Sequence, residues 1–180
     1  MNMPRTVALL ALVLLFAAAT AARAQTCTAT QKPNTVSSCT VSSTVGVNVV
    51  KSVSLSMSNA ATTLATPAVA DVDAGLQRVA TSGPVLTVRA NSAWVVNIKA
   101  LNETWTAGAG GRVDKPASDL RWSLSASGTF TALSTAGSQL ATGAATTAAS
   151  YQLFFKAAYN WVDDLPGTYN LPVVLTITAP

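Results

Sequence analysis

Apolar residues recur at every second position through much of the chain after residue 44, which is the period of a half-buried β-strand. Between Val45 and Met57 they occupy the odd positions, with Lys51 as the only interruption, and Ser and Asn fill much of the other parity. This pattern predicts two strands separated by a bend near Lys51.

The next segments with the same period lie in the middle of the chain. Residues 84–90 and 93–101 predict a β-hairpin that turns at Asn91-Ser92. Residues 120–124 alternate again and are followed by a short segment at 129–133.

The last 30 residues carry the strongest pattern. Aromatic and aliphatic side chains share one parity from Tyr151 to Trp161, which predicts one long strand. The run Asp-Asp-Leu-Pro-Gly at 163–167 predicts a turn, and residues 169–177 predict a final strand. Pro172 has no amide hydrogen, so this part of the strand is expected at a sheet edge or a bulge.

The remaining segments show weaker signals. Residues 59–83 and 135–150 are irregular and predict at most one weak strand each, and 106–111 (TAGAGG) predicts a flexible loop. About seven to nine strands without a helical period indicate an all-β fold, an antiparallel immunoglobulin-like β-sandwich over residues 45–180. A closed barrel is the alternative.

The first 24 residues predict a cleaved signal peptide. A basic start at 1–5 precedes an apolar run at 7–19, and Ala22-Arg23-Ala24 gives the small-x-small pattern before Gln25. The run is too short for a membrane span, which takes roughly 20 residues. We therefore expect an exported protein, in the periplasm, at the cell surface or in the medium, without a membrane span after cleavage.

Residues 25–44 form a polar N-terminal arm with both cysteines. Cys27 and Cys39 predict a disulfide, since an even pair in an exported chain is normally oxidised. The closed loop would add about 2–3 kcal/mol at best. Lipidation of Cys27 is the alternative, but Thr26 stands where a lipoprotein signal has a small residue.

The charge argues against nucleic acid as a partner. The chain has 11 Lys and Arg against 7 Asp and Glu, and loss of Arg5 and Arg23 with the signal leaves a net charge of +2. Charged residues make up 10% of the chain, less than half the usual fraction of about a quarter. Such a surface is hydrated mainly by Ser and Thr hydroxyls, as in exported wall and filament proteins.

Few catalytic chemistries remain open. The chain has no histidine, which excludes Ser-His-Asp and Cys-His systems and most zinc or copper sites. Paired carboxylates could still support glycoside hydrolysis. The segment Asp71-Val-Asp73-Ala-Gly75 resembles half of a calcium loop, although ordinary turn residues explain it better. We expect neither enzymatic activity nor a cofactor.

The four tryptophans are the remaining candidates for ligand contact. Trp94, Trp122 and Trp161 share the apolar parity of strands, which predicts core positions. Trp105 stands before the glycine-rich loop, where an indole can stack on a sugar or plug the open end of the sandwich. Arg112 and Lys115 flank the same loop and are candidate contacts to an anionic glycan, although ordinary solvated charges explain them better.

Two segments carry a resemblance to known families. Residues 165–180 (LPGTYNLPVVLTITAP) and 85–94 (VLTVRANSAW) resemble secreted, pilin-like bacterial sandwiches such as spore-coat-U and related fimbrial proteins. Trp122-Ser123-Leu124 also resembles the W-x-L motif of wall-binding WxL domains, although the second motif expected near the C-terminus is absent. The resemblance implies a surface or filament role and carries over no functional residue.

The sequence thus favours a non-enzymatic surface protein with a structural or adhesive role, including that of a fimbrial subunit. Its partners would be other surface proteins or copies of itself. Residues 40–50 have the alternation that a donated strand requires, whereas 167–177 resembles a full final strand of a self-complete fold. The alternative function is a polysaccharide-binding module that uses Trp105 and the 106–112 loop.

Overall fold

The computed structural model describes residues 27–28 and 38–180 and divides into two compact units, 1–48 and 49–180. All regular secondary structure of the described residues lies in the second unit. Its strands are β1 (Val53–Met57), β2 (Thr81–Ala90), β3 (Trp94–Ala100), β4 (Thr106–Ala107), β5 (Leu120–Ser123), β6 (Thr131–Ala132), β7 (Ser138–Gly143), β8 (Thr146–Ala157), β9 (Tyr169–Asn170) and β10 (Val173–Thr178). Its two short helices are α1 (Val69–Asp73) and a 3₁₀ turn at Ala117–Asp119.

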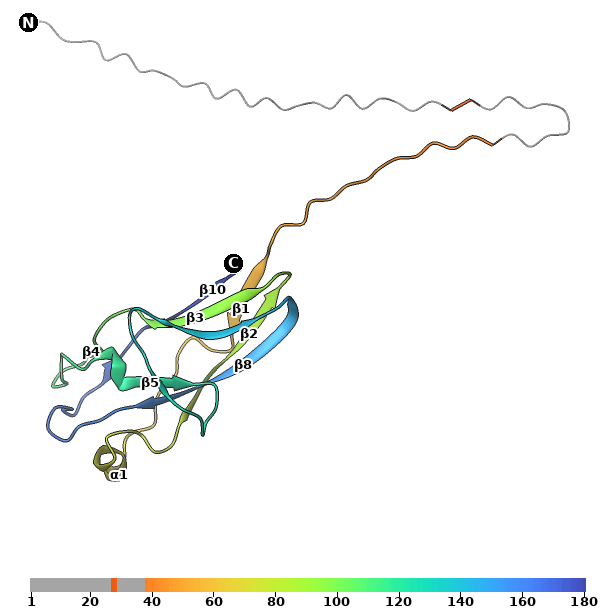
Figure 1. The fold of residues 1–180 in the computed structure, drawn as a ribbon. Helices are drawn as coiled ribbons and strands as arrows, with labels where there is room; N and C mark the ends of the chain where they lie inside the picture. The colour runs from red at the N-terminus through yellow and green to blue at the C-terminus, as the bar shows by residue number, and fades with distance from the viewer. Residues whose placement is uncertain (1–26, 29–37) are drawn as a thin grey trace, which may run out of the picture. The chain divides into compact units, whose positions relative to one another are not determined.

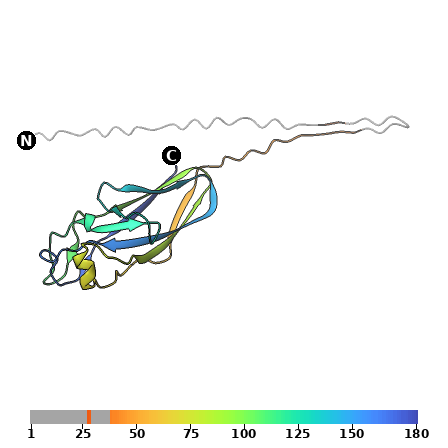
Figure 2. The ribbon, with the colours of Figure 1, turned by 60° about the horizontal axis from the view of Figure 1, so that its bottom comes forward.

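The strands form antiparallel sheets, which confirms the predicted all-β class (Figure 1). One sheet has the order β1-β2-β8-β5-β6, the other has the order β10-β3-β7, and β4 pairs with β9 in a small ribbon. The helix α1 and the β4 loop lie at one end of the unit, called the loop end here (Figures 1 and 2). The C-terminus and the start of β1 lie at the other end, called the arm end.

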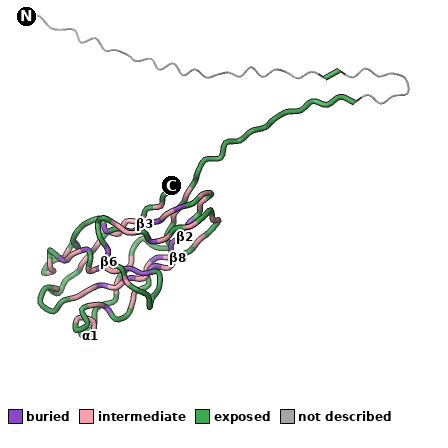
Figure 3. Tube along the Cα trace, viewed as in Figure 1, coloured by how far each residue is buried: buried purple, intermediate pink, exposed green. Residues whose placement is uncertain are grey.

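One hydrophobic core lies between the two large sheets. Leu86 and Val88 on β2 and Val96 and Ile98 on β3 have no exposed surface, because the inward parity of each strand faces the opposite sheet. Figure 3 shows this buried set along β2, β3 and β8. Trp94 and Trp122 belong to the same core, as their parity predicted.

Both strands predicted at 84–101 are present, but they do not pair with each other, so the predicted hairpin is wrong. β2 pairs with β1 and β8, whereas β3 pairs with β10 and β7 in the other sheet. Both strands have a fully buried apolar face, and two such faces can both be buried if they oppose each other across the core. The connection at 91–93 therefore crosses between the sheets.

Four other segments differ from the sequence prediction. The segment 45–51 is not a strand, and 135–150 contains β7 and the start of β8 in place of one weak strand. The predicted loop 106–111 begins with the paired residues of β4. The last predicted strand is divided into β9 and β10 by Leu171 and Pro172, and β10 is a sheet edge, where a proline is tolerated.

The long strand predicted to reach Trp161 ends at Ala157, so the predicted core position of Trp161 is wrong. The Trp161 side chain is 62% exposed. The cause is a local turn in which Asn160 Oδ1 accepts from the Val162 amide at 2.8 Å and Asp164 Oδ2 accepts from the Asn160 amide at 2.8 Å. Such side-chain hydrogen bonds compete with the strand ladder and end it.

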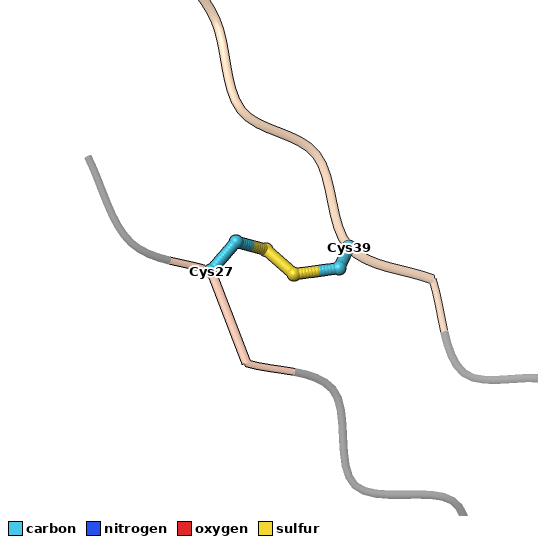
Figure 4. The surroundings of a disulfide bond; sticks show 2 residues. All are labelled: Cys27 and Cys39. Carbon is cyan, nitrogen blue, oxygen red and sulfur yellow. A yellow bond between two sulfur atoms is a disulfide. The ribbon is translucent and has the colours of Figure 1, made fainter. Parts of the chain in front are cut away.

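In the first unit, Cys27 and Cys39 form the predicted disulfide, with their Cα atoms 5.9 Å apart (Figure 4). The signal peptide predicted at 1–24 lies outside the described residues. Within the described residues, no helix is long and apolar enough to cross a membrane.

Candidate functional site

The two large sheets are joined along one side of the core. The chain between β6 and β7 bonds to both sheets, because the Leu133 amide donates to Leu120 O at 2.8 Å and the Ala100 amide donates to Ser134 O at 2.9 Å. Leu133 and Leu140 fill the space beneath this connection and are almost fully buried. This side of the core is closed by the chain itself.

On the opposite side, β1 and β10 lie close together at the arm end, and the core is open only from Met57 toward the loop end. β1 pairs only with β2 and β10 only with β3, so the outer edge of each strand has no ladder partner in the described part of the chain. The inward side chains of both strands, such as Leu55, Val173 and Leu175, are only half-buried, whereas those of β2 and β3 are fully buried. We call this opening the open seam, bounded by residues 57–67 and by residues 165–175.

The open seam contains a groove of about 1080 Å³. Its wall includes core side chains of the central strand β8, namely Leu153 and Phe155, together with Met57, Leu64, Leu171 and Leu175. A β-sandwich that lacks one edge strand would have a groove of this kind, reaching its core side chains.

At the loop end of the groove the wall contains a buried cation. Lys115 is 2% exposed, and its Nζ donates to Asp119 Oδ2 at 2.9 Å, Asp164 Oδ1 at 2.9 Å and Ala158 O at 2.8 Å. The rings of Tyr159 and Tyr169 lie 5.2 and 6.0 Å from the same atom. An ammonium group has three donors, so Lys115 is saturated by the protein and holds its loops together.

Arg112 lies beside this cluster and is linked to it through Asp164. Arg112 Nε is 2.7 Å from Asp114 Oδ1, and its Nη1 is 3.7 Å from Asp164 Oδ1. The hydrogen bond between Arg112 and Asp114 raises the pKa of Arg112 and lowers the pKa of Asp114. The structure therefore brings Arg112 and Lys115 together, as their spacing suggested, but with carboxylates of the chain itself as partners.

The loops around the cluster pack closely because glycines meet there. The Gly108 amide donates to Thr168 O at 2.7 Å, and a Cβ on Gly167 would lie 2.9 Å from Gly111 Cα. The Tyr169 hydroxyl accepts from the Arg112 amide at 2.9 Å and donates to Leu165 O. These contacts make the loop end a fixed wall of the groove.

Trp105 fills this end of the domain. It is 8% exposed, its Nε1 donates to Pro116 O at 3.1 Å, and its amide donates to Lys115 O at 2.8 Å. Of the two roles that the sequence left open, the structure places the indole in the position of the plug. The exposed tryptophan is Trp161, whose Nε1 donates to Asp73 Oδ1 at 2.9 Å.

The acidic pair that resembled a calcium loop makes turn contacts. Asp71 accepts from the Arg78 amide at 2.7 Å and from the Ala68 amide at 2.8 Å, and these bonds lower its pKa. Asp73 is the partner of Trp161. No group of three or more His, Cys, Asp or Glu side chains that could hold a metal ion occurs among the described residues.

The segment before β1 is the second part of the candidate site. Val45, Val47 and Val49 are 94%, 87% and 75% exposed and lie outside any strand. Residues 40–50 (TVSSTVGVNVV) contain no charged side chain. The segment therefore has the apolar alternation of a β-strand but is not paired with any strand.

The open seam could not be predicted from the sequence, because it depends on which strands pair. The only signal for it is that the apolar alternation extends eight residues upstream of Val53, farther than β1 itself requires. Comparison with known proteins adds no name to the site, since no family model, no curated protein and no solved structure matches the chain.

Proposed function

We propose that this protein is a structural subunit of a bacterial surface filament, built on an immunoglobulin-like sandwich that lacks one edge strand. Residues 40–50 of a second copy would fill the open seam and complete the fold. The observation that carries the proposal is the coexistence of two features: a groove between residues 57–67 and the edge strand β10 with residues 165–172, and an uncharged segment whose valines alternate in solvent.

The geometry of strand addition fits both parts. A donated strand gains affinity from main-chain hydrogen bonds to a free edge and specificity from pockets for every second side chain. At about 3.3 Å per residue, the three valines from 45 to 49 span about 13 Å, within the roughly 20 Å of the six-residue β10. One parity would face the groove, and Gly46 and Asn48 would face outward.

The energy of this insertion comes mainly from the valines. Full burial of one valine side chain is worth about 1.5–3 kcal/mol, so three of them supply roughly 5–9 kcal/mol. This is close to the cost of ordering the backbone of residues 45–49, at about 1–2 kcal/mol per residue, and main-chain hydrogen bonds to the edge would supply the remainder. A charge in the segment would have to be desolvated at a large cost. Its absence from residues 40–50 is therefore what a groove of this composition requires.

Other features support an exposed filament as the setting. The predicted export signal and the Cys27–Cys39 disulfide suit an oxidising compartment. The hydroxyl-rich surface and the resemblance of 165–180 to fimbrial proteins point the same way. Carbohydrate binding is the second candidate, favoured by Trp161, whose exposed ring is fixed by Asp73 and could stack on a sugar.

A peptide with the sequence of residues 40–50 tests the proposal. Added in excess to the exported, purified protein, it should occupy the open seam and shorten any oligomers in a dose-dependent way. A control peptide of the same composition, with its valines moved to alternate between the two parities, should have no effect. Equal effects of both peptides, or no uptake of either labelled peptide by the protein, would contradict the proposal.

A further inference from the structure

The arm leaves the folded unit beside Asn91, at the point where β2 ends. β1 and β2 pair with Val53 opposite Ala90, so Ser52 and Asn91 are the next pair of the same ladder. Beyond Asn91 the chain crosses to the other sheet and begins β3. The strand β1 would therefore have no ladder partner upstream of Ser52.

The Asn91 side chain continues the ladder in place of the missing backbone. The backbone amide of Asn91 donates to Ser52 O at 3.2 Å, and the Asn91 side-chain Oδ1 accepts from the Ser52 backbone amide at 2.7 Å. Its Nδ2 donates to Val50 O at 2.8 Å. The side-chain amide thus acts as a peptide group and keeps residues 50–52 in line with β1.

A second contact, exposed to solvent, links Lys51 of this segment to the opposite sheet. Lys51 Nζ donates to Pro180 O, just after the end of β10. Residues 50–52 are therefore fixed at the arm end between the turn after β2 and the end of β10.

This attachment distinguishes two ways of filling the open seam. For the seam to receive the arm of its own chain, residues 50–52 would have to reverse direction as a three-residue hairpin loop. Such loops need helical and left-handed backbone conformations, which would break the bonds of Val50 and Ser52 to Asn91. A strand from another copy requires no change at residues 50–52.

We propose that Asn91 is a positioning residue that holds residues 50–52 in line with β1 and so disfavours the hairpin needed for self-closure, leaving the seam to be filled by another copy. This inference rests on the proposed function. According to this inference, the Asn91 side chain determines whether the protein forms a filament or a closed monomer.

The test compares Asn91→Ala with Ser92→Ala, which alters the same connection and leaves the bonds to residues 50 and 52 in place. Loss of about two hydrogen bonds should raise the share of monomer about tenfold in Asn91→Ala, measured by light scattering after size exclusion. In these monomers the amides of residues 45–49 should be protected from hydrogen exchange to the same degree at every protein concentration. In the unchanged protein, their protection should rise with concentration.

The outcomes separate this inference from the proposed function. If both variants form the same oligomers as the unchanged protein, Asn91 has no directing role, while strand exchange stands. If the unchanged protein is monomeric and its residues 45–49 exchange freely at every concentration, strand exchange itself is wrong. Asn91→Asp keeps the acceptor for the Ser52 amide and loses the donor to Val50 O. A share of monomer between those of the unchanged protein and Asn91→Ala would therefore show that the hydrogen bonds set the oligomeric state. A loss of cooperative unfolding in both Asn91 variants would show instead that Asn91 only supports the fold.

Discussion

Lys115 shows how a charged side chain in a charge-poor protein can be wholly structural. Its three donors end on Asp119, in the turn before β5, and on Ala158 and Asp164, in the loop after β8. No pattern around residue 115 predicted this burial, because Asp164 is 49 residues away in the chain. The sequence favoured a solvated charge, with contact to an anionic glycan as the alternative, since a lysine beside a glycine-rich loop usually lies in solvent.

Lys115→Met should therefore destabilise the protein strongly. The variant leaves the Asp164 and Asp119 carboxylates without their common cation, and removal of one partner of a buried pair costs about 3–5 kcal/mol. Urea unfolding followed by tryptophan fluorescence measures the loss. Lys99→Met, at an exposed position on β3, is the matched control and should change stability by no more than about 0.5 kcal/mol. A Lys115→Met protein as stable as this control would show that the cluster is not what holds the loop end.

The two loop tryptophans should separate stability from binding. Trp105→Ala should cost about 3–5 kcal/mol of unfolding free energy, because a buried indole leaves a cavity. Trp161→Ala should change stability far less, since its ring is mostly in solvent and loses one hydrogen bond. If carbohydrate binding is also a function, pull-down with insoluble cell-wall polysaccharide should weaken with Trp161→Ala. Binding that is lost only in folded Trp105→Ala would restore Trp105 as the contact residue.

At the scale of elements, the hydrophobic period identified most strands but not their partners. The positions of β2, β3, β5 and β10 follow from alternation, which is a local property of pleated backbone. Pairing depends on which apolar faces oppose each other across the core, and residues 84–101 look the same as a hairpin or as a crossing between sheets. The prediction for Trp161 is wrong for a related reason: the Val162 amide donates to Asn160 Oδ1, and this local hydrogen bond ends the strand before the apolar period ends.

The edge strand β10 gives a prediction at this scale. Along an antiparallel edge, about every second amide points away from its only neighbour and exchanges with solvent. In β10 these amides should exchange quickly in dilute protein and become protected as oligomers form. Hydrogen exchange read by mass spectrometry at two concentrations measures the change, with β3 as the internal control because it is paired on both sides. Rapid exchange of β10 in isolated oligomers would exclude this edge as the receiving strand.

For the whole molecule, the sequence left open whether the sandwich is complete in itself. Residues 167–177 have the alternation of a final strand and suggested completeness, yet β10 and residues 57–67 leave a groove between them. Only the arrangement of strands in space shows that the two edges are free. Under the proposed function, the exposed valines at 45, 47 and 49 would fill that groove in another copy.

The central claim is that residues 40–50 of one copy complete the fold of another. Light scattering after size exclusion of the exported protein tests it most directly, with Val47→Asp compared against Asn48→Asp. The two variants carry the same charge at adjacent positions of opposite parity, so only Val47→Asp places a carboxylate in the groove. We predict oligomers for the unchanged protein and Asn48→Asp, and monomers for Val47→Asp. Oligomers of equal size for all three, or monomers for all three, would contradict strand exchange.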